Sequence, residues 1–288
     1  MINEIVKQKF IVMKTIRISS IFILFAVFTF IFTSCEKDQI TNTEDAIITT
    51  EEATAAEGMF DDAFDQAEMY ENDDANKSTT EGYCIPTIEI AYPEDRPYPR
   101  VVTIDFGTEG CEGRHGAIRK GVIIVTVTGF FLETGSKRII TFDGYSVNDY
   151  QIEGTKTVTN MGQNDAGNWV RKIEVDGSVT TPEGKIITRI STGEIEWIEG
   201  AGTPFYFWDD VFSITGTASG VNSKGVAYQS EITSPLIKAR NCRWIQEGIL
   251  TIVSGENTVI IDYGDGTKCD NVATATVNGE EKEIKFKW

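Results

Sequence analysis

The chain has 288 residues, of which 26 are Lys or Arg and 44 are Asp or Glu, and its formal net charge is −18. Apolar residues make up 41% and aromatic residues 10% of it, which excludes a collagen, a coiled coil and a protein with many membrane spans. The acidity argues against a nucleic-acid partner, because neutralising phosphates requires clustered Lys and Arg. A chain of this length can build one or two ordinary cores.

Residues 1–34 have the composition of a secretory signal peptide. A basic segment with Lys14 and Arg17 precedes an apolar run over residues 21–33, and leaders typically carry about 7–15 apolar residues after a basic start. The run is shorter than the ~20 residues that a spanning helix needs, so an uncleaved membrane anchor is the weaker alternative. The leader is unusually long, and translation from Met13 is an alternative start.

The leader ends in Phe32-Thr33-Ser34-Cys35, which resembles the lipobox of bacterial lipoproteins, with Phe32 where an aliphatic residue is usual. The resemblance implies cleavage before Cys35 and acylation of this cysteine, for example by palmitate. An ordinary signal peptide without lipid is the alternative. The next residues, Glu36-Lys37-Asp38, resemble the signal that exports Bacteroidota lipoproteins to the outer face, although a solvated tether has the same composition. We expect a lipid anchor in the outer membrane, on its periplasmic side or at the cell surface.

Residues 35–83 form an acidic segment. Between residues 36 and 83 there are fifteen acids and two bases, a net charge of −13 that leaves −5 for the remainder. Such a charge block usually repels itself, which predicts an extended tether. Thr49 and Glu52 suit a capping box. Downstream, an i, i+3, i+4, i+7 pattern places four residues on one helical stripe: Phe60, Ala63, Phe64 and Ala67. This short amphipathic helix either docks on the next domain, forms transiently, or offers a docking site to another envelope protein.

Residues 84–288 predict an all-β domain, an antiparallel sandwich or an open barrel-like meander. Short β-rich runs such as 122–127, 185–190 and 258–263 are separated by Gly and Pro, which is typical of antiparallel architectures. The last run alternates, with Ile284, Phe286 and Trp288 on one face. Turns are expected at Asp143-Gly144, Asp176-Gly177, Ser223-Lys224-Gly225 and Asn278-Gly279, the last as a tight hairpin.

The four cysteines of this domain repeat at one interval. Twenty-seven residues separate Cys84 from Cys111, and twenty-seven separate Cys242 from Cys269. Before the second cysteine of each pair stand similar pieces, Thr103-Ile104-Asp105-Phe106-Gly107 and Ile260-Ile261-Asp262-Tyr263-Gly264. Four cysteines allow three pairings, and the repeat favours a duplicated hairpin with the disulfides Cys84–Cys111 and Cys242–Cys269. An oxidising compartment outside the cytoplasm permits such bonds.

Several pieces of residues 84–288 resemble an uncharacterised family of Bacteroidota outer-membrane lipoproteins. The resemblance covers nearly the whole domain and agrees with the lipobox, but it implies no chemistry. The pieces that carry it are Thr103-Ile104-Asp105-Phe106-Gly107, Arg119-Lys120-Gly121, Glu153-Gly154-Thr155-Lys156-Thr157-Val158, Ile214-Thr215-Gly216-Thr217-Ala218-Ser219-Gly220 and Asp262-Tyr263-Gly264-Asp265-Gly266.

Catalytic candidates are few. The single histidine, His115, lies in a glycine-rich stretch, where a surface loop without a role is the simpler interpretation than a catalytic triad. Asp209 and Asp210 are the paired carboxylates that would support a glycan-active hydrolase. Neighbouring residues of a strand point to opposite faces, which argues against a shared site. We therefore expect no catalysis, with this hydrolase as the alternative.

Two binding sites are considered. Phe205, Tyr206, Phe207 and Trp208 precede the two aspartates, and aromatic rings of this kind stack on sugars, although a core-facing strand end is the simpler interpretation. Asp262, Asp265 and Asp270 give a density of oxygens that suits Ca²⁺, although an ordinary Asp-Gly turn has the same residues. The sequence thus favours an exported envelope protein with a binding or structural role, no cofactor other than an optional calcium ion, and a protein or glycan partner.

Overall fold

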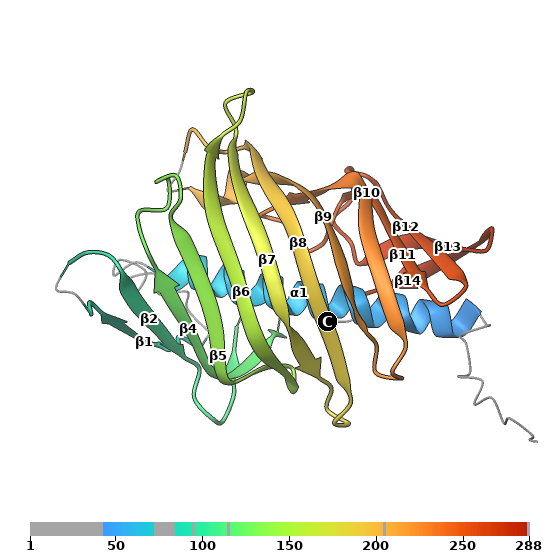
Figure 1. The fold of residues 1–288 in the computed structure, drawn as a ribbon, viewed down its shortest axis with the longest axis horizontal. Coiled ribbons are helices and arrows are strands. Elements are labelled where there is room, and N and C mark those ends of the chain that lie inside the picture. Colours follow the sequence, from blue (N-terminus) through green and yellow to red (C-terminus); the bar gives the residue numbers. More distant parts are fainter. Residues whose placement is uncertain (1–42, 72–83, 94–95, 114–115, 204–205, 287–288) are drawn as a thin grey trace, which may run out of the picture. The chain divides into compact units, whose positions relative to one another are not determined.

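The computed structural model describes residues 43–71, 84–93, 96–113, 116–203 and 206–286. They belong to one unit, Asp38–Trp288, built from one long helix and a 14-stranded antiparallel sheet. The predicted all-β architecture with an N-terminal helix is confirmed, in its open-meander form (Figure 1). The elements are α1 (Thr43–Tyr70), β1 (Thr87–Ala91), β2 (Arg100–Asp105), β3 (Cys111–Glu112), β4 (Ile118–Val127), β5 (Lys137–Val147), β6 (Tyr150–Gln163), β7 (Trp169–Thr180), β8 (Ile186–Glu199), the 3₁₀ helix η3 (Phe207–Asp209), β9 (Val211–Val221), β10 (Ala227–Ala239), β11 (Glu247–Ser254), β12 (Asn257–Asp265), β13 (Val272–Val277) and β14 (Glu280–Lys285).

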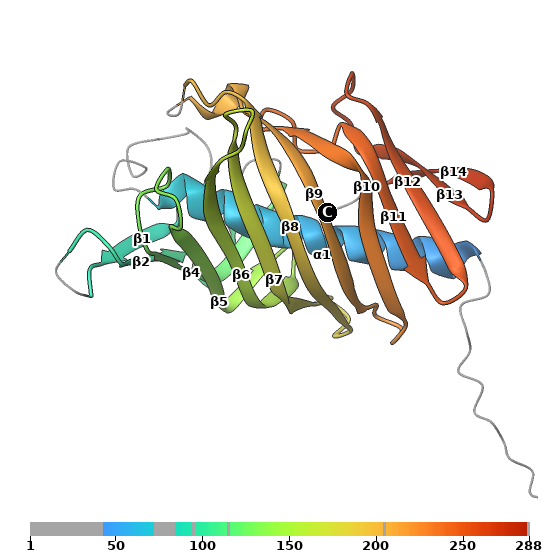
Figure 2. The ribbon, with the colours of Figure 1, turned by 45° about the horizontal axis from the view of Figure 1, so that its top comes forward.

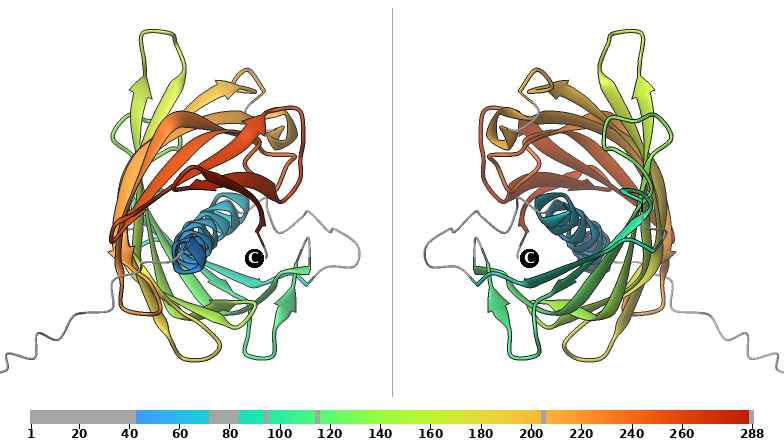
Figure 3. Two further views of the ribbon diagram at one scale, coloured as in Figure 1. Left: turned by 90° about the vertical axis from the view of Figure 1, so that its right-hand side faces the viewer. Right: turned by 90° about the vertical axis from the view of Figure 1, so that its left-hand side faces the viewer.

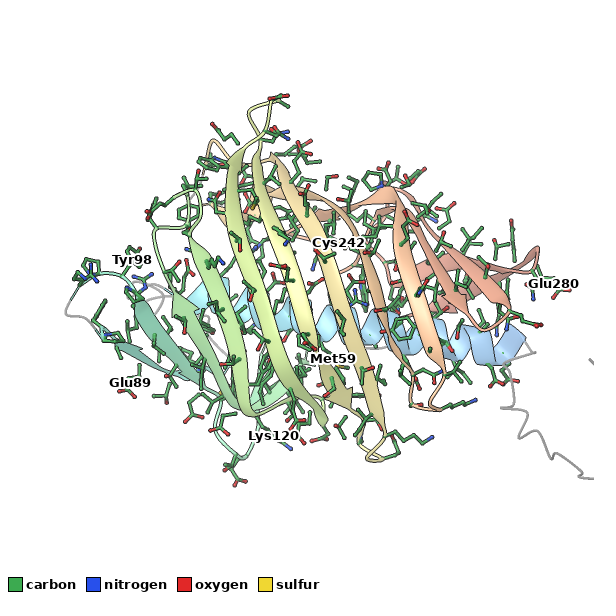
Figure 4. The ribbon with its side chains drawn as sticks, viewed as in Figure 1. Met59, Glu89, Tyr98, Lys120, Cys242 and Glu280 are labelled. Atoms are coloured by element: carbon green, nitrogen blue, oxygen red, sulfur yellow. A yellow bond between two sulfur atoms is a disulfide. The ribbon has the colours of Figure 1, made fainter. Side chains whose placement is uncertain are left out.

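The strands pair in chain order from β1 to β14, except that β3 pairs with β4 off the main path. Figures 2 and 3 show the sheet curling around α1, which lies along its concave side. Among the described residues, no pairing joins β1 to β14, so the sheet is a trough and not a closed barrel. Figure 4 labels Glu89 and Tyr98 at the β1–β2 end of this trough and Glu280 at the other end.

Alternation along the strands divides their two faces. The alternation predicted for the last strand is confirmed as far as Phe286, because Ile284 and Phe286 are 3% and 7% exposed while Glu283 and Lys285 face solvent. Trp288 lies outside the described residues. The tight turn at Asn278-Gly279 is also confirmed. Both residues have positive φ, 53° and 88°, as a two-residue hairpin between right-twisted strands requires. A turn also joins β9 to β10 at Ser223-Lys224-Gly225.

Two of the expected turns are wrong. Asp143-Gly144 lies within β5 and Asp176-Gly177 within β7. Gly144 sits where the register shifts between β4 and β5 and between β5 and β6, so it marks a bulge. Gly177 admits the helix, because a Cβ atom there would lie 2.6 Å from Cζ of Phe60. Gly144 and Gly177 therefore allow a bulge and close packing within the strands, and they do not form turns between strands.

The two disulfides have the predicted pairing. Cys84 bonds Cys111 and Cys242 bonds Cys269, with Cα–Cα distances of 5.2 and 5.7 Å. The first bond closes the β1–β2 hairpin and the second the β11–β12 hairpin.

The turns that follow the two hairpins also match. Gly107 N donates to Asp105 Oδ1 at 2.7 Å, and Gly264 N donates to Asp262 Oδ1 at 2.8 Å. The predicted duplication is therefore visible in local geometry as well as in sequence.

Helix α1 joins two hydrophobic cores. Its C-terminal half packs on a core built mainly by β2 to β8, and its N-terminal half on a core built mainly by β10 to β14. The predicted stripe of Phe60, Ala63, Phe64 and Ala67 is buried, with at most 6% of any member exposed. Of the alternatives left open by the sequence, docking on the sheet is the one observed.

The helix is longer than its sequence pattern predicts, with 28 residues. The capping box at Thr49 and Glu52 is wrong, because both residues lie inside the helix. Thr49 Oγ1 instead donates to the carbonyl of Asp45, four residues earlier, which is the usual bond of a threonine in a helix interior.

Candidate functional site

A row of basic side chains on the concave face of the sheet contacts the acidic helix. Residues 43–71 contain ten acids and no base, and most of these acids meet a base from the sheet. We call the sheet residues the inner bases: Arg119, Arg138, Lys156, Arg171, Arg189, Lys238 and Arg240. Each of the consecutive strands β4 to β8 supplies one. Lys238 lies at the end of β10, and Arg240 directly follows that strand.

Two arginines of the sheet make two-pronged contacts with acids towards the C-terminal end of α1. Arg119 donates from Nε to Asp62 at 2.9 Å and also from its Nη2. Arg138 donates to both oxygens of Glu71 at 2.9 Å. Only 6% and 8% of these arginine side chains are exposed. Burial disfavours a charged Arg119, but its hydrogen bond and charge interaction with Asp62 outweigh burial and raise its pKa.

The most deeply buried base is Lys156 on β6. Its Nζ donates to Asp61 Oδ1 at 2.6 Å and to the carbonyl of Phe60 at 3.2 Å, and it lies 5.3 Å from the ring centre of Phe64. Burial acts to raise the pKa of Asp61, but the charges of Lys156, Lys238 and Arg189 and the hydrogen bond from Lys156 together outweigh burial, and the pKa is lowered. Asp61 is therefore held as a carboxylate beside the buried lysine.

Glu68 bridges two arginines. It accepts from Arg171 Nη1 at 2.5 Å and from Arg240 Nη1 at 2.7 Å. Burial acts to raise the pKa of Glu68, but the two guanidinium charges lower it to about 2. The indole of Trp197 lies 5.9 Å from Arg171, which places an aromatic residue beside this charged cluster.

The two candidate hydrolytic acids have different surroundings. Asp210 is 3% exposed and accepts from Trp197 Nε1 at 3.1 Å. Asp209 is exposed and accepts from Thr203 Oγ1 at 2.8 Å. Burial raises the pKa of Asp210 to about 6, against the opposing charge of Arg240. Each acid thus has a hydrogen-bond donor within the protein.

The aromatic segment before these acids is not a strand end. The sequence predicts a strand, whereas the structure has the single turn η3, Phe207–Asp209. Tyr206 is 58% and Trp208 is 45% exposed. Phe205 and the side chain of Phe207 lie outside the described part of the chain.

A large groove lies beside the helix. Its volume is about 1290 Å³, above the 300–1,000 Å³ usual for small-molecule sites. It follows α1 from Glu51 to Glu71, which at 1.5 Å per residue is a length of about 30 Å. We call it the α1 groove. Helix residues Ala55 and Met59 line one side, and the sheet contributes apolar side chains, among them Phe106, Val179, Ile187, Ile195, Phe212 and Ile214.

Several of the charged groups that line the α1 groove are paired with one another. Asp62 with Arg119, Glu71 with Arg138 and Glu68 with Arg171 all line it and all form ion pairs. Further charged residues, among them Lys185, Arg243 and Lys285, line it as well, so its surface combines apolar side chains with charged ones. Trp208, from the aromatic segment singled out in the sequence, also lines the groove.

The calcium candidates cap separate turns. Asp262 Oδ1 accepts from Gly264 N, Asp265 Oδ1 from Thr267 N and Oγ1, and Asp270 Oδ1 from Val272 N. Within the described residues, no three His, Cys, Asp or Glu side chains form a group that could hold a metal ion. The geometry is that of Asx turns, in which each carboxylate accepts from the backbone N–H two residues further along the chain.

Other predicted features fall outside the described residues. These are the leader 1–34, the lipidation site Cys35 and His115. Across the segments that the structure does describe, no helix has the length and hydropathy needed to span a bilayer.

The chain matches no family model, no curated protein and no solved structure. The function is therefore argued from the geometry of the α1 groove and its surroundings.

Sequence reasoning missed the inner bases, although a signal was present. Lys156 has the same strand parity as the buried residues Ile152 and Val158, and Arg189 the same parity as buried Ile187. A charge on the inward side of an alternating strand predicts a buried partner. The uncompensated acids of residues 43–71 are that partner.

Proposed function

We propose that this protein is an exported, lipid-anchored envelope protein that binds an apolar ligand in the α1 groove and has no catalytic role. The observation that carries the proposal is the groove itself. A space of about 1290 Å³ beside the helix is large enough to hold a small-molecule ligand. A long space bordered by apolar side chains is the usual form of a binding site.

Export is supported by the two disulfides, since such bonds persist in oxidising compartments. The lipobox that ends at Cys35 and the resemblance to Bacteroidota lipoproteins support a lipid anchor in the outer membrane. In this proposal the lipid holds the protein at the membrane, and the trough carries the ligand.

Ligand retention can be tested on protein purified from its native envelope. An organic extract of the purified protein, analysed by mass spectrometry, is expected to contain an apolar compound in a fixed ratio to the chain. In Ala55→Trp, a bulky ring occupies the α1 groove, and the compound should be lost. The matched control Ala55→Ser keeps the groove open and should retain it. A wild-type extract without any such compound would overturn the binding role.

The anchor is tested separately. Cys35→Ala removes the thiol that is to be acylated, and the variant is expected to leave the membrane fraction or to keep its leader uncut. A variant that is processed and still fractionates with membranes contradicts the lipid anchor.

A further inference from the structure

We propose that the ligand of the α1 groove is a long acyl chain lying parallel to the helix. This inference rests on the proposed binding function and specifies its ligand class. Four features of the groove support it: its length, its lining, its charge balance and its exposed apolar rim.

The first feature is length. The α1 groove follows the helix from Glu51 to Glu71, about 30 Å at 1.5 Å per residue. A hydrocarbon layer of a bilayer has about this thickness, so the groove is long enough for an extended chain of the kind found in membranes. A compact ligand would leave most of it empty.

The second feature is the lining. The sheet side is formed by β-strands that pair with neighbours on both sides, so most of their backbone donors and acceptors are already engaged. A bound peptide would bring its own backbone groups and find few partners there. An acyl chain has no such groups, and the half-buried apolar side chains Ile195, Phe212 and Ile214 suit it.

The third feature is charge. The inner bases would favour an anionic ligand if they stood alone, but the acids of α1 already pair with them. Arg119 is bonded to Asp62, Arg138 to Glu71, and Glu68 joins Arg171 to Arg240. A ligand that competed for these cations would have to displace the helix. A neutral hydrocarbon chain can lie beside the ion pairs without breaking them.

The fourth feature is the rim. Large apolar side chains that line the α1 groove are also strongly exposed: Met69 at 44%, Trp208 at 45%, Ile85 at 46% and Phe130 at 49%. Exposed apolar side chains grouped at a concave site mark a binding surface. They provide an apolar path between the groove and its surroundings, and among the described strands the sheet is left open between β1 and β14. A polar head group can remain in solvent at this opening.

The test is a chain-length series. The purified full-length protein is titrated calorimetrically with octanoate, dodecanoate and hexadecanoate. If the chain lies in the groove, each added pair of methylene groups should tighten binding about tenfold. A head-group contact alone would give nearly equal affinities for the three acids. Equal affinities would overturn the proposal.

Variants locate the bound chain. Ala55→Trp fills the groove and Met69→Lys places a charge at its rim, and each should weaken hexadecanoate binding at least tenfold. Ile190→Trp on the convex face, where Ile190 is 60% exposed, should bind as the wild type does. Circular dichroism and thermal melting check that each variant is folded, and Met69 is exposed enough to be replaced without loss of the core. Folded groove variants that bind hexadecanoate with wild-type affinity would contradict the proposal.

The source of the chain is resolved in a second arm. Vesicles of phosphatidylethanolamine and phosphatidylglycerol are incubated with the protein, which is then separated and extracted. Recovery of phospholipid with the protein assigns the chain to a membrane lipid. Binding of hexadecanoate without phospholipid recovery assigns it to a free fatty acid. If hexadecanoate does not bind and no phospholipid is recovered, the acyl-chain proposal is refuted.

The outcome also separates this inference from the proposed function. If the native protein carries an apolar compound that Ala55→Trp loses, and no acyl chain binds, the function stands and the acyl chain is wrong. If the native protein carries no compound and no acyl chain binds, both fail.

Discussion

Lys156 Nζ on β6 lies 2.6 Å from the Asp61 carboxylate on α1, although only 1% of the lysine side chain is exposed. Removing one partner of a buried ion pair leaves an uncompensated charge and typically costs about 3–5 kcal/mol. Asp61→Asn should therefore lower the free energy of unfolding by about this amount, because the lysine remains buried. Adding Lys156→Met to Asp61→Asn should recover much of the loss.

Urea denaturation of the two single variants and the double variant measures this coupling. The exposed pair of Lys172 and Glu174, with side chains 40% and 50% exposed, is the control. Lys172→Ala should change stability by less than about 1 kcal/mol. A double variant no more stable than Asp61→Asn would show that the buried pair does not act as a unit.

Gly177 on β7 should not tolerate a side chain. A Cβ atom there would lie 2.6 Å from Phe60 Cζ and 2.4 Å from the carbonyl oxygen of Glu153. Overpacking of this kind costs about 1–3 kcal/mol, so Gly177→Ala should destabilise the protein by that amount. Gly202→Ala is the matched control, since a Cβ atom at Gly202 meets nothing within 4 Å. Thermal melting of both variants decides the matter, and equal melting temperatures would rule out close packing of α1 on β7.

Each disulfide should stabilise the fold because it restricts the conformations of the unfolded chain. A bond that closes a loop of 27 residues contributes about 3–4 kcal/mol in the chain-entropy account. The double substitution of Cys242 and Cys269 by Ala should lower the free energy of unfolding by up to this amount. Mass spectrometry of non-reduced peptides should find Cys84 linked to Cys111. A peptide that links Cys84 to Cys242 would contradict the structure.

Asp210 and Glu68 should change the free energy of unfolding in opposite directions as the pH rises. The pKa of Asp210 is raised by burial to about 6, whereas an unfolded aspartate ionises near about 3.9. Between these values the folded state holds the extra proton, so this group makes stability fall as pH rises from about 4 to about 6, by up to about 3 kcal/mol. Asp210→Asn should remove that fall.

Glu68 acts in the other direction. Arg171 and Arg240 outweigh burial and lower its pKa to about 2, below the value of about 4.3 for an unfolded glutamate. Its contribution is present above about pH 4.3 and is lost as the pH falls towards 2. Urea unfolding between pH 2 and 7 measures both effects, with Glu68→Gln as the second variant. Unchanged pH profiles in both variants would refute these assignments.

Much of the fold could be predicted from local patterns. The alternation of Ile284 and Phe286, the Asn278-Gly279 hairpin and the repeated cysteine spacing all depend on neighbouring residues, and the structure confirms them. The stripe that contains Phe60 and Phe64 can also be predicted, because the spacing of residues alone determines which of them share a helix face.

The ion pairs between the helix and the sheet could not be predicted from local patterns. Acids at residues 57–71 find their bases on strands between residues 119 and 240, and pairing across such distances depends on how the trough curls. Asp143-Gly144 and Asp176-Gly177 have the local chemistry of turns, but the sheet uses them as a bulge and as space for Phe60. The α1 groove is a space between elements and has no sequence pattern of its own.

A crystal structure of the protein purified from its native envelope tests the central claim most directly. We predict continuous electron density for an elongated apolar molecule beside α1, in contact with Ala55, Ile195 and Phe212. A groove filled only by ordered water, or closed by the helix moving against the sheet, would contradict the account.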